Sequence, residues 1–185
     1  MERLIKIAAD LLDFCEAQNW RACVIGGLAV QRWGEPRLTL DVDLSLLTGF
    51  GQEAVFVEKL TERYEARVEN PQAFALRNRV LLLTQHAVGI DVAFAAIPFE
   101  ERAIERSSSF EFLPSKSLRT CSAEDLIVYK AFADRPRDWV DIEGIVVRQG
   151  SELDVQLIQT ELGPLVVAKE SPGILTRLRQ MFRSL

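Results

Sequence analysis

The sequence predicts an α/β protein, with a mixed β-sheet core flanked by helices over residues 1–121 and a C-terminal helical bundle over residues 122–185. Three observations support this prediction. Over residues 22–47 an apolar run, a glycine pair and an alternating apolar–polar run follow one another, which is typical of strand, turn, short helix and strand. Further runs with strand character follow up to residue 95. Beyond residue 122 apolar residues recur only at helical spacing.

The first region is expected to alternate helices and strands. Apolar residues recur every three or four positions over residues 3–18 and 52–64, and Val55 is expected on the buried stripe of the latter. The strand-like runs are separated by short polar turns such as His86-Ala87. We expect strands at residues 22–25, 38–47, 74–76, 80–85 and 88–95, a peripheral hairpin of residues 110–113 and 118–120, and short helices at residues 28–33 and 98–106.

The second region is expected to hold four helices. Ser122 is expected to cap the first of them. Pro136 fits the first position of the second helix, whose inward residues are expected to include Val140. The third helix is expected at residues 154–167 and the fourth after the Ser171-Pro172 pair.

Composition narrows the class of protein. Of the 185 residues, 48% are hydrophobic and 26% charged, as in ordinary soluble globular proteins, and no apolar run is long enough to cross a membrane. The N-terminus lacks a signal-peptide core, so we expect a cytoplasmic protein without a membrane partner. The net charge of −5 disfavours broad, non-specific nucleic-acid binding. The three cysteines have no CxxC spacing, and His86 is the only histidine, which argues against zinc and most histidine-based metal sites.

The chemistry is expected around residues 24–47. A helix that starts on Gly26 and Gly27 presents bare backbone N–H groups, which suit a phosphate. On the following strand, Asp41 and Asp43 share a face and lie about 6–7 Å apart, a spacing that suits oxygen ligands of Mg²⁺. The alternation places four polar residues on one face, Thr39, Asp41, Asp43 and Ser45, and four apolar residues on the other, Leu40, Val42, Leu44 and Leu46.

Asp91 is the one acid in the otherwise apolar run of residues 88–95. A lone carboxylate is costly to bury, so we expect it at the open end of its strand or paired with a cation. Each feature also has a plain structural explanation: the alternating acids can be a solvated strand face and the glycine pair an ordinary turn. An α/β interaction domain without chemistry therefore stays an alternative.

Taken together, these motifs resemble those of the nucleotidyltransferase fold superfamily, the group related to DNA polymerase beta. Ile25-Gly26-Gly27 and Asp41-Val42-Asp43-Leu44 match its paired motifs, and Asp91 fits its third acid. The run from Arg37 through Thr39 to Asp43 is similar to that of the AbiEii toxins and the related MenT enzymes. Lys130, followed by Arg137-Asp138-Trp139-Val140-Asp141, resembles the helical region of that group. Within this second motif, Arg137 and Asp141 have the spacing of a helical ion pair.

The resemblance implies a site and a reaction. Asp41, Asp43 and Asp91 would be catalytic and hold Mg²⁺ or Mn²⁺, with Asp91 completing the metal site or acting as the base on the attacking hydroxyl. The nucleotide would be bound by Gly26, Gly27, Arg37, Thr39, Lys130 and Asp138.

The enzyme would move a nucleoside monophosphate from an NTP to a hydroxyl of an RNA 3′ end (tRNA included), a protein or a small molecule. It would be the toxin part of a toxin–antitoxin or phage-defence system, with an antitoxin protein as partner. A catalytically silent nucleotide-binding or protein-interaction domain of the same fold stays the alternative.

Overall fold

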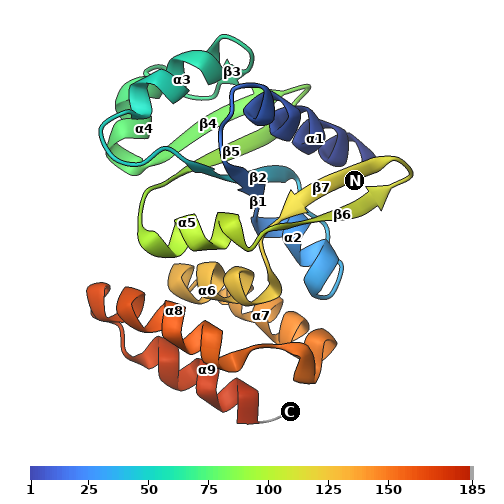
Figure 1. The fold of residues 1–185 in the computed structure, drawn as a ribbon, viewed down its shortest axis with the longest axis vertical. Coiled ribbons are helices and arrows are strands. Elements are labelled where there is room, and N and C mark those ends of the chain that lie inside the picture. Colours follow the sequence, from blue (N-terminus) through green and yellow to red (C-terminus); the bar gives the residue numbers. More distant parts are fainter. Residues whose placement is uncertain (184–185) are drawn as a thin grey trace. The chain divides into compact units, whose positions relative to one another are not determined.

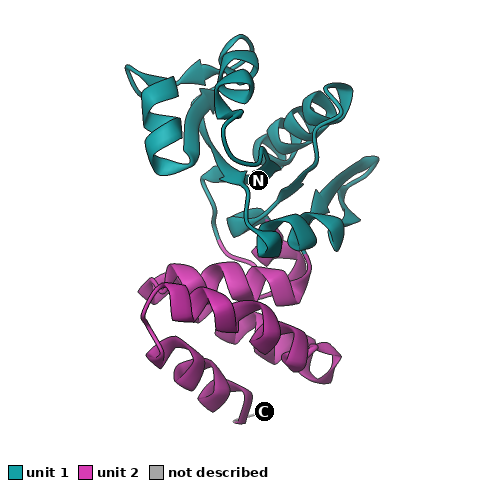
Figure 2. Ribbon diagram, turned by 60° about the vertical axis from the view of Figure 1, so that its left-hand side comes forward, with its two compact units in different colours: residues 1–28, 38–121 teal, residues 29–37, 122–185 magenta. Residues whose placement is uncertain are grey.

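The computed structural model describes residues 1–183 and confirms the mixed α/β fold class (Figure 1). Its residues group into two compact units (Figure 2). Unit 1 consists of residues 1–28 and 38–121, and unit 2 of residues 29–37 and 122–185. Helix α2 (Gly26–Trp33) begins in unit 1 and continues in unit 2. No helix among the described residues is both long and apolar enough to cross a membrane.

Unit 1 is built on one mixed sheet, in which the described strands run in the order β3-β4-β5-β2-β1-β7-β6. The β2–β5 and β1–β7 pairs are parallel and the other neighbours are antiparallel. The expected peripheral hairpin therefore joins the sheet, through β7. The strands are β1 (Ala22–Val24), β2 (Asp41–Leu47), β3 (Glu65–Ala66), β4 (Val80–Gln85), β5 (Val88–Ala95), β6 (Ser108–Leu113) and β7 (Lys116–Thr120).

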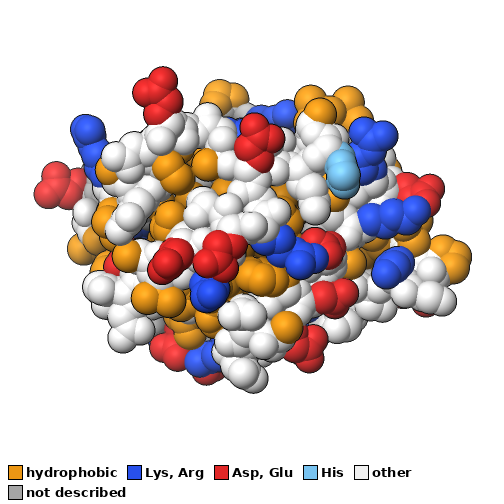
Figure 3. Space-filling view, turned by 90° about the horizontal axis from the view of Figure 1, so that it is seen from above, with side chains coloured by type: hydrophobic (Ala, Val, Ile, Leu, Met, Phe, Trp, Pro, Cys, Tyr) orange, Lys and Arg blue, Asp and Glu red, His pale blue; other side chains and the backbone are white. Residues whose placement is uncertain are grey.

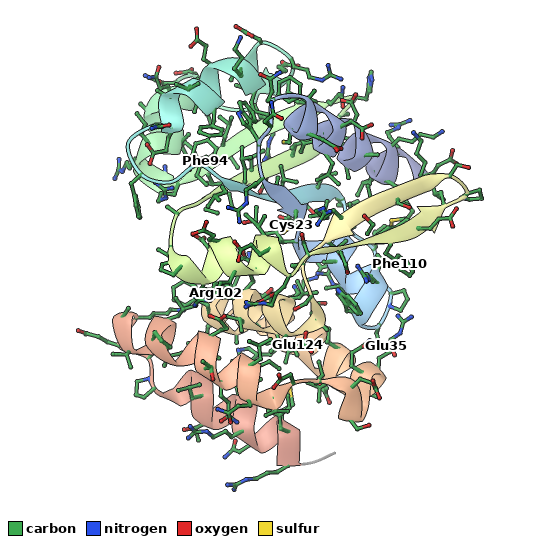
Figure 4. All side chains as sticks on the ribbon, viewed as in Figure 1. Cys23, Glu35, Phe94, Arg102, Phe110 and Glu124 are labelled. Carbon is green, nitrogen blue, oxygen red and sulfur yellow. The ribbon has the colours of Figure 1, made fainter. Side chains whose placement is uncertain are left out.

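Helices cover this sheet with their apolar stripes. Helix α1 (Glu2–Ala17) packs on β1, β2, β6 and β7, and α5 (Pro98–Glu105) contacts β2. Helix α3 (Glu53–Thr61) contacts α4 (Pro71–Asn78), which packs on β4. Cys23 of β1 and Phe94 of β5 are both buried in the sheet (Figure 4). His86 is exposed at the β4–β5 turn, as the sequence predicts, and is the histidine visible in Figure 3.

Unit 2 contains α6 (Ala123–Ala133), α7 (Pro136–Gln149), α8 (Val155–Ala168) and α9 (Gly173–Arg183), with a short 3-10 turn at Gly150–Glu152. The predicted start signals are confirmed: the Ser122 hydroxyl accepts a hydrogen bond from the Asp125 N–H at 3.1 Å, and Pro136 opens α7. Residues 29–37 join this unit because side chains of α7 bind their carbonyls. Arg148 donates to the Gly34 oxygen and Gln149 to the Trp33 oxygen, each at 2.6 Å.

One predicted strand is wrong. Residues 74–76 lie in α4, because the Asn70 side chain accepts a hydrogen bond from the Ala73 N–H at 3.0 Å and Pro71 occupies the first turn. The strand that pairs with β4 at this edge is β3, which the sequence analysis does not predict.

The predicted alternation is also wrong before Asp41. Strand β2 begins at Asp41 rather than at residue 38, and Leu40 is 72% exposed whereas Thr39 is buried. Val42, Leu44 and Leu46 are fully buried, as the alternation predicts, but Ser45 on the opposite face is also buried. Helices α1 and α5 both contact this central strand, whose residues are buried apart from the exposed Asp41 and the partly exposed Asp43 and Leu47.

Two helical residues face the wrong way relative to the prediction. Val55 on α3 and Val140 on α7 are exposed, and their neighbours Val57 and Trp139 are buried in their place. The rest of each apolar stripe is buried, so only a residue at its edge differs from the prediction.

Candidate active site

The three acids come from two neighbouring strands of unit 1. Strands β2 and β5 are parallel, with Asp43 directly opposite Asp91 and Asp41 opposite Gly89. Residues opposite one another in a sheet point to the same face, and adjacent strands lie about 4.8 Å apart. Asp41, two positions before Asp43, lies on that face too. The sheet therefore brings the three sequence-predicted acids to one face, near the beginning of β2.

The glycine pair meets this face at Asp43. The Ile25 N–H donates to the Asp43 carbonyl at 2.9 Å, and the Gly27 N–H donates to the Asp43 Oδ2 atom at 3.3 Å. Gly26 has φ +60°, and a Cβ there would lie 1.9 Å from the same Oδ2 atom. Only glycine fits this approach, and the positive end of α2 faces the carboxylate.

Thr39 positions the other β2 acid. Its hydroxyl donates to the Asp41 Oδ1 atom at 2.9 Å. The side chain is held against the start of α2, where a Cβ on Gly27 would lie 2.2 Å from the Thr39 Oγ1 atom. Thr39 is thus buried because it fills the space that Gly27 leaves, and its hydroxyl orients Asp41.

Asp91 is paired with a cation, one of the two situations expected from the sequence. The Arg67 guanidinium binds its Oδ1 atom. Burial raises the pKa of Asp91 and the nearby charge of Asp41 raises it further, while Arg67 opposes both effects, and the net shift is upward. No local sequence pattern predicts a role for Arg67.

The donor chemistry of this face fits a divalent metal in part. Asp41 and Asp43 supply the carboxylate oxygens that Mg²⁺ prefers, and Mg²⁺ is commonly bound by one or two carboxylates plus substrate phosphates. Within residues 1–183 no three acidic, histidine or cysteine side chains form a group that could hold a metal ion. The arrangement thus supports a two-carboxylate site, with Asp91 bound to Arg67 instead.

The remaining predicted residues lie in unit 2, where they bind one another. The Lys130 Nζ atom lies 2.6 Å from the Asp141 Oδ2 atom and 3.2 Å from the Asp138 Oδ1 atom. Arg37 binds Asp141 through two hydrogen bonds, of 2.5 and 2.7 Å. Arg135 binds Asp138 at 2.6 Å. We call these five residues the α6–α7 ion cluster.

Burial makes this cluster energetically important. The side chains of Lys130, Asp138 and Asp141 are 6%, 4% and 2% exposed. Buried charges are tolerated only when they are paired. Burial raises the pKa of Asp141, but the hydrogen bonds from Arg37 and Lys130 outweigh it, so the pKa lies below its ordinary value. Asp141, expected to pair with Arg137, instead joins Arg37 to Lys130.

Comparison with protein-family models matches residues 19–169 to the nucleotidyl transferase AbiEii toxin family of type IV toxin–antitoxin systems. The chain belongs to this family. The predicted resemblance is therefore confirmed. As a member of the AbiEii family, this chain is a nucleotidyltransferase, an enzyme that moves a nucleoside monophosphate. The interaction-domain alternative is not supported. A comparison with curated proteins finds no match.

Solved structures agree with the AbiEii assignment at the level of fold. An antigenic nucleotidyltransferase-like protein from Paracoccidioides brasiliensis has a TM-score of 0.54 and 16% identity, over 96% of this chain and 93% of that chain. The crystal structure of ANT(2″)-Ia in complex with adenylyl-2″-tobramycin has a TM-score of 0.55 and 16% identity, over 89% of this chain and 98% of that one. At such identities the likeness shows the nucleotidyltransferase fold alone.

Proposed function

We propose that this chain is a metal-dependent nucleotidyltransferase that moves a nucleoside monophosphate from an NTP to a hydroxyl acceptor, with Mg²⁺ or Mn²⁺ as the cofactor. The observation that carries the proposal is the register of β2 and β5, which sets Asp43 beside Asp91 on the face that also presents Asp41. The start of α2, directed at the Asp43 carboxylate, supports it.

In this proposal Asp41 and Asp43 hold the metal. When bound, the metal neutralises charge on the triphosphate and assists the departure of pyrophosphate. Thr39 fixes the Asp41 carboxylate through its hydroxyl, and the Gly27 N–H fixes that of Asp43. Asp91 completes the metal site or accepts the proton of the acceptor hydroxyl. As the acceptor oxygen forms its bond to the α-phosphorus, the bond to pyrophosphate breaks.

The nucleotide-binding assignments are part of the same proposal. The backbone N–H groups of Gly26 and Gly27 approach the phosphates at the start of α2. In unit 2, Arg37 and Lys130 supply cations, and Asp141 already binds both of them. A phosphate bound there would join or replace a carboxylate as their partner, and Asp138 would hold Lys130 in place.

The acceptor is a hydroxyl of an RNA 3′ end, a protein or a small molecule. ANT(2″)-Ia was solved with adenylyl-2″-tobramycin, which makes an aminoglycoside a suitable small-molecule probe for this chain. The family name supports the proposal of a toxin with an antitoxin partner. A cytoplasmic location is part of the same proposal. An experiment can therefore treat RNA, protein and aminoglycoside as three arms of one assay.

The test is incubation of the protein with Mg²⁺ and each of four α-labelled NTPs, with total RNA, cell protein or tobramycin as the acceptor. The wild type is expected to label one acceptor class, and Asp43→Asn to lose the labelling almost completely while keeping its melting temperature. Asp13→Asn, an exposed change of the same chemistry on α1, is the matched control and should remain active. Labelling by Asp43→Asn at the wild-type rate would refute the catalytic assignment.

A further inference from the structure

Arg67 lies in a position that its sequence context does not reveal. It directly follows β3, and its N–H donates to the Leu82 carbonyl on β4 at 2.9 Å. Leu82 is opposite Asp91, and Asp91 is opposite Asp43. Arg67 therefore occupies the same cross-strand row as two of the acids. Its guanidinium binds the Asp91 Oδ1 atom.

This guanidinium lies beside Gly89 of the neighbouring strand β5. Gly89 lies opposite Asp41 on β5. A Cβ on Gly89 would lie 3.5 Å from the Arg67 Nη1 atom and 3.7 Å from the Asp41 Cβ atom. The guanidinium thus lies beside the strand position that is opposite Asp41, while it binds Asp91. Its charge offsets part of the repulsion among the three carboxylates.

A divalent cation on this face would offset the same repulsion, so it competes with Arg67. Both cations need the Asp91 carboxylate, and they repel one another when they are close. Among residues 1–183 no group of three potential ligands is assembled, which agrees with Asp91 being held by Arg67 rather than gathered with Asp41 and Asp43.

We propose that Arg67 is the resting counter-ion of Asp91, and that a divalent cation held by Asp41 and Asp43 gains Asp91 only by displacing the Arg67 guanidinium. The inference rests on the proposed function to the extent that the acid face binds a metal. It adds a positioning residue that sets metal affinity and engages the Asp91 carboxylate until the metal arrives.

The test is calorimetric titration of Mn²⁺ into the nucleotide-free protein. Arg67→Gln is expected to bind the metal about tenfold more tightly, because the competing charge is gone. Arg67→Lys keeps the charge and should stay near the wild-type affinity. Arg63→Gln is the matched control: Arg63 precedes β3 on the same segment but binds Asp10 on α1, so its loss should leave metal affinity unchanged.

A double-mutant cycle separates competition from a merely structural role. Asp91→Asn should weaken Mn²⁺ binding more in the Arg67→Gln background than in the wild type, because only there is Asp91 already available to the metal. Equal or weaker binding by Arg67→Gln, or an equal effect of Asp91→Asn in both backgrounds, would overturn the proposal. Failure of the proposed function looks different, since Asp43→Asn would then bind Mn²⁺ as the wild type does, or no variant would bind it.

Discussion

At the scale of single residues, Gly26 shows why this site needs its glycine pair. Its φ of +60° lies in the left-handed region that disfavours other residues, and its Cα lies against the Asp43 carboxylate. The positive φ and the close approach to Asp43 are separate requirements for glycine. The backbone conformation affects folding stability, whereas the contact decides where a proposed metal ligand points.

Gly26→Ala is expected to separate these requirements when compared with Gly49→Ala. Both positions have positive φ, but a Cβ on Gly49 meets nothing within 4 Å. Gly49→Ala should lose about 1–2 kcal/mol of unfolding free energy, measured by urea denaturation, and Gly26→Ala should lose more, because its Cβ also displaces Asp43. Only Gly26→Ala should also lose NMP transfer, by roughly 100-fold or more, because Asp43 must move. Similar activities in the two variants would contradict the role of the Gly26–Asp43 contact.

The sequence predicts the glycines and the acids of β2 because they are close together in the chain and have a recognisable spacing. Arg67 could not be predicted in this way. Its contact with Asp91 depends on the pairing of β3 with β4 and of β4 with β5, and no local pattern specifies that register. The bonds that Asp141 makes to Arg37 and Lys130 depend similarly on tertiary packing.

At the scale of secondary-structure elements, β2 has one face that is fully packed, and its first acids lie on the opposite face. Alternation predicts its buried leucines correctly from Val42 onward, but fails at Leu40, where the chain is not yet in the sheet. Residues 74–76 fail for a related reason: three residues are too few to separate a strand from a helix, and the deciding signal was the cap at Asn70-Pro71.

Leu44→Asp and Leu40→Asp test this boundary. Leu44 is fully buried, so an unpaired carboxylate there should cost more than about 4 kcal/mol of unfolding free energy or prevent folding. Leu40 is 72% exposed, so the same change should stay within about 0.5 kcal/mol. Urea denaturation measures both. A large loss for Leu40→Asp would show that β2 begins earlier than the structure places it.

The α6–α7 ion cluster should contribute strongly to the stability of unit 2. Lys130→Met is expected to cost about 3–5 kcal/mol, because it leaves the carboxylates of Asp138 and Asp141 buried with fewer partners. Arg135→Met, which removes a mostly exposed partner of Asp138, should cost less than about 1 kcal/mol. Chemical denaturation distinguishes the two, and equal losses would refute the importance of burial.

The lowered pKa of Asp141 gives this cluster a pH dependence with a definite sign. A carboxyl whose pKa is lower in the folded state stabilises the protein above its unfolded-state pKa, and that stabilisation is lost as the pH falls through the folded-state value. The unfolding free energy should therefore decrease on acidification below the ordinary aspartate range. The decrease should be shallower in Asp141→Asn, and parallel pH profiles would contradict the assignment.

At the scale of the whole molecule, the family match spans residues 19–169 and thus includes residues of both units. The boundary that the sequence analysis places between residues 121 and 122 stays a prediction. Residues 29–37 belong to unit 2 through bonds from α7, more than 100 residues away in the chain. Local patterning predicts the helix at 28–33 but not this membership.

The most direct test of nucleotidyl transfer follows both the α-phosphate and the γ-phosphate of the NTP in the same reaction. With α-labelled NTP the label should appear on the acceptor, and with γ-labelled NTP it should appear in pyrophosphate, in equal amounts and only with Mg²⁺ or Mn²⁺ present. Asp43→Asn should abolish both signals. Transfer of the γ-label to the acceptor, release of the γ-label as inorganic phosphate, or full activity of Asp43→Asn would contradict nucleotidyl transfer by this acid face.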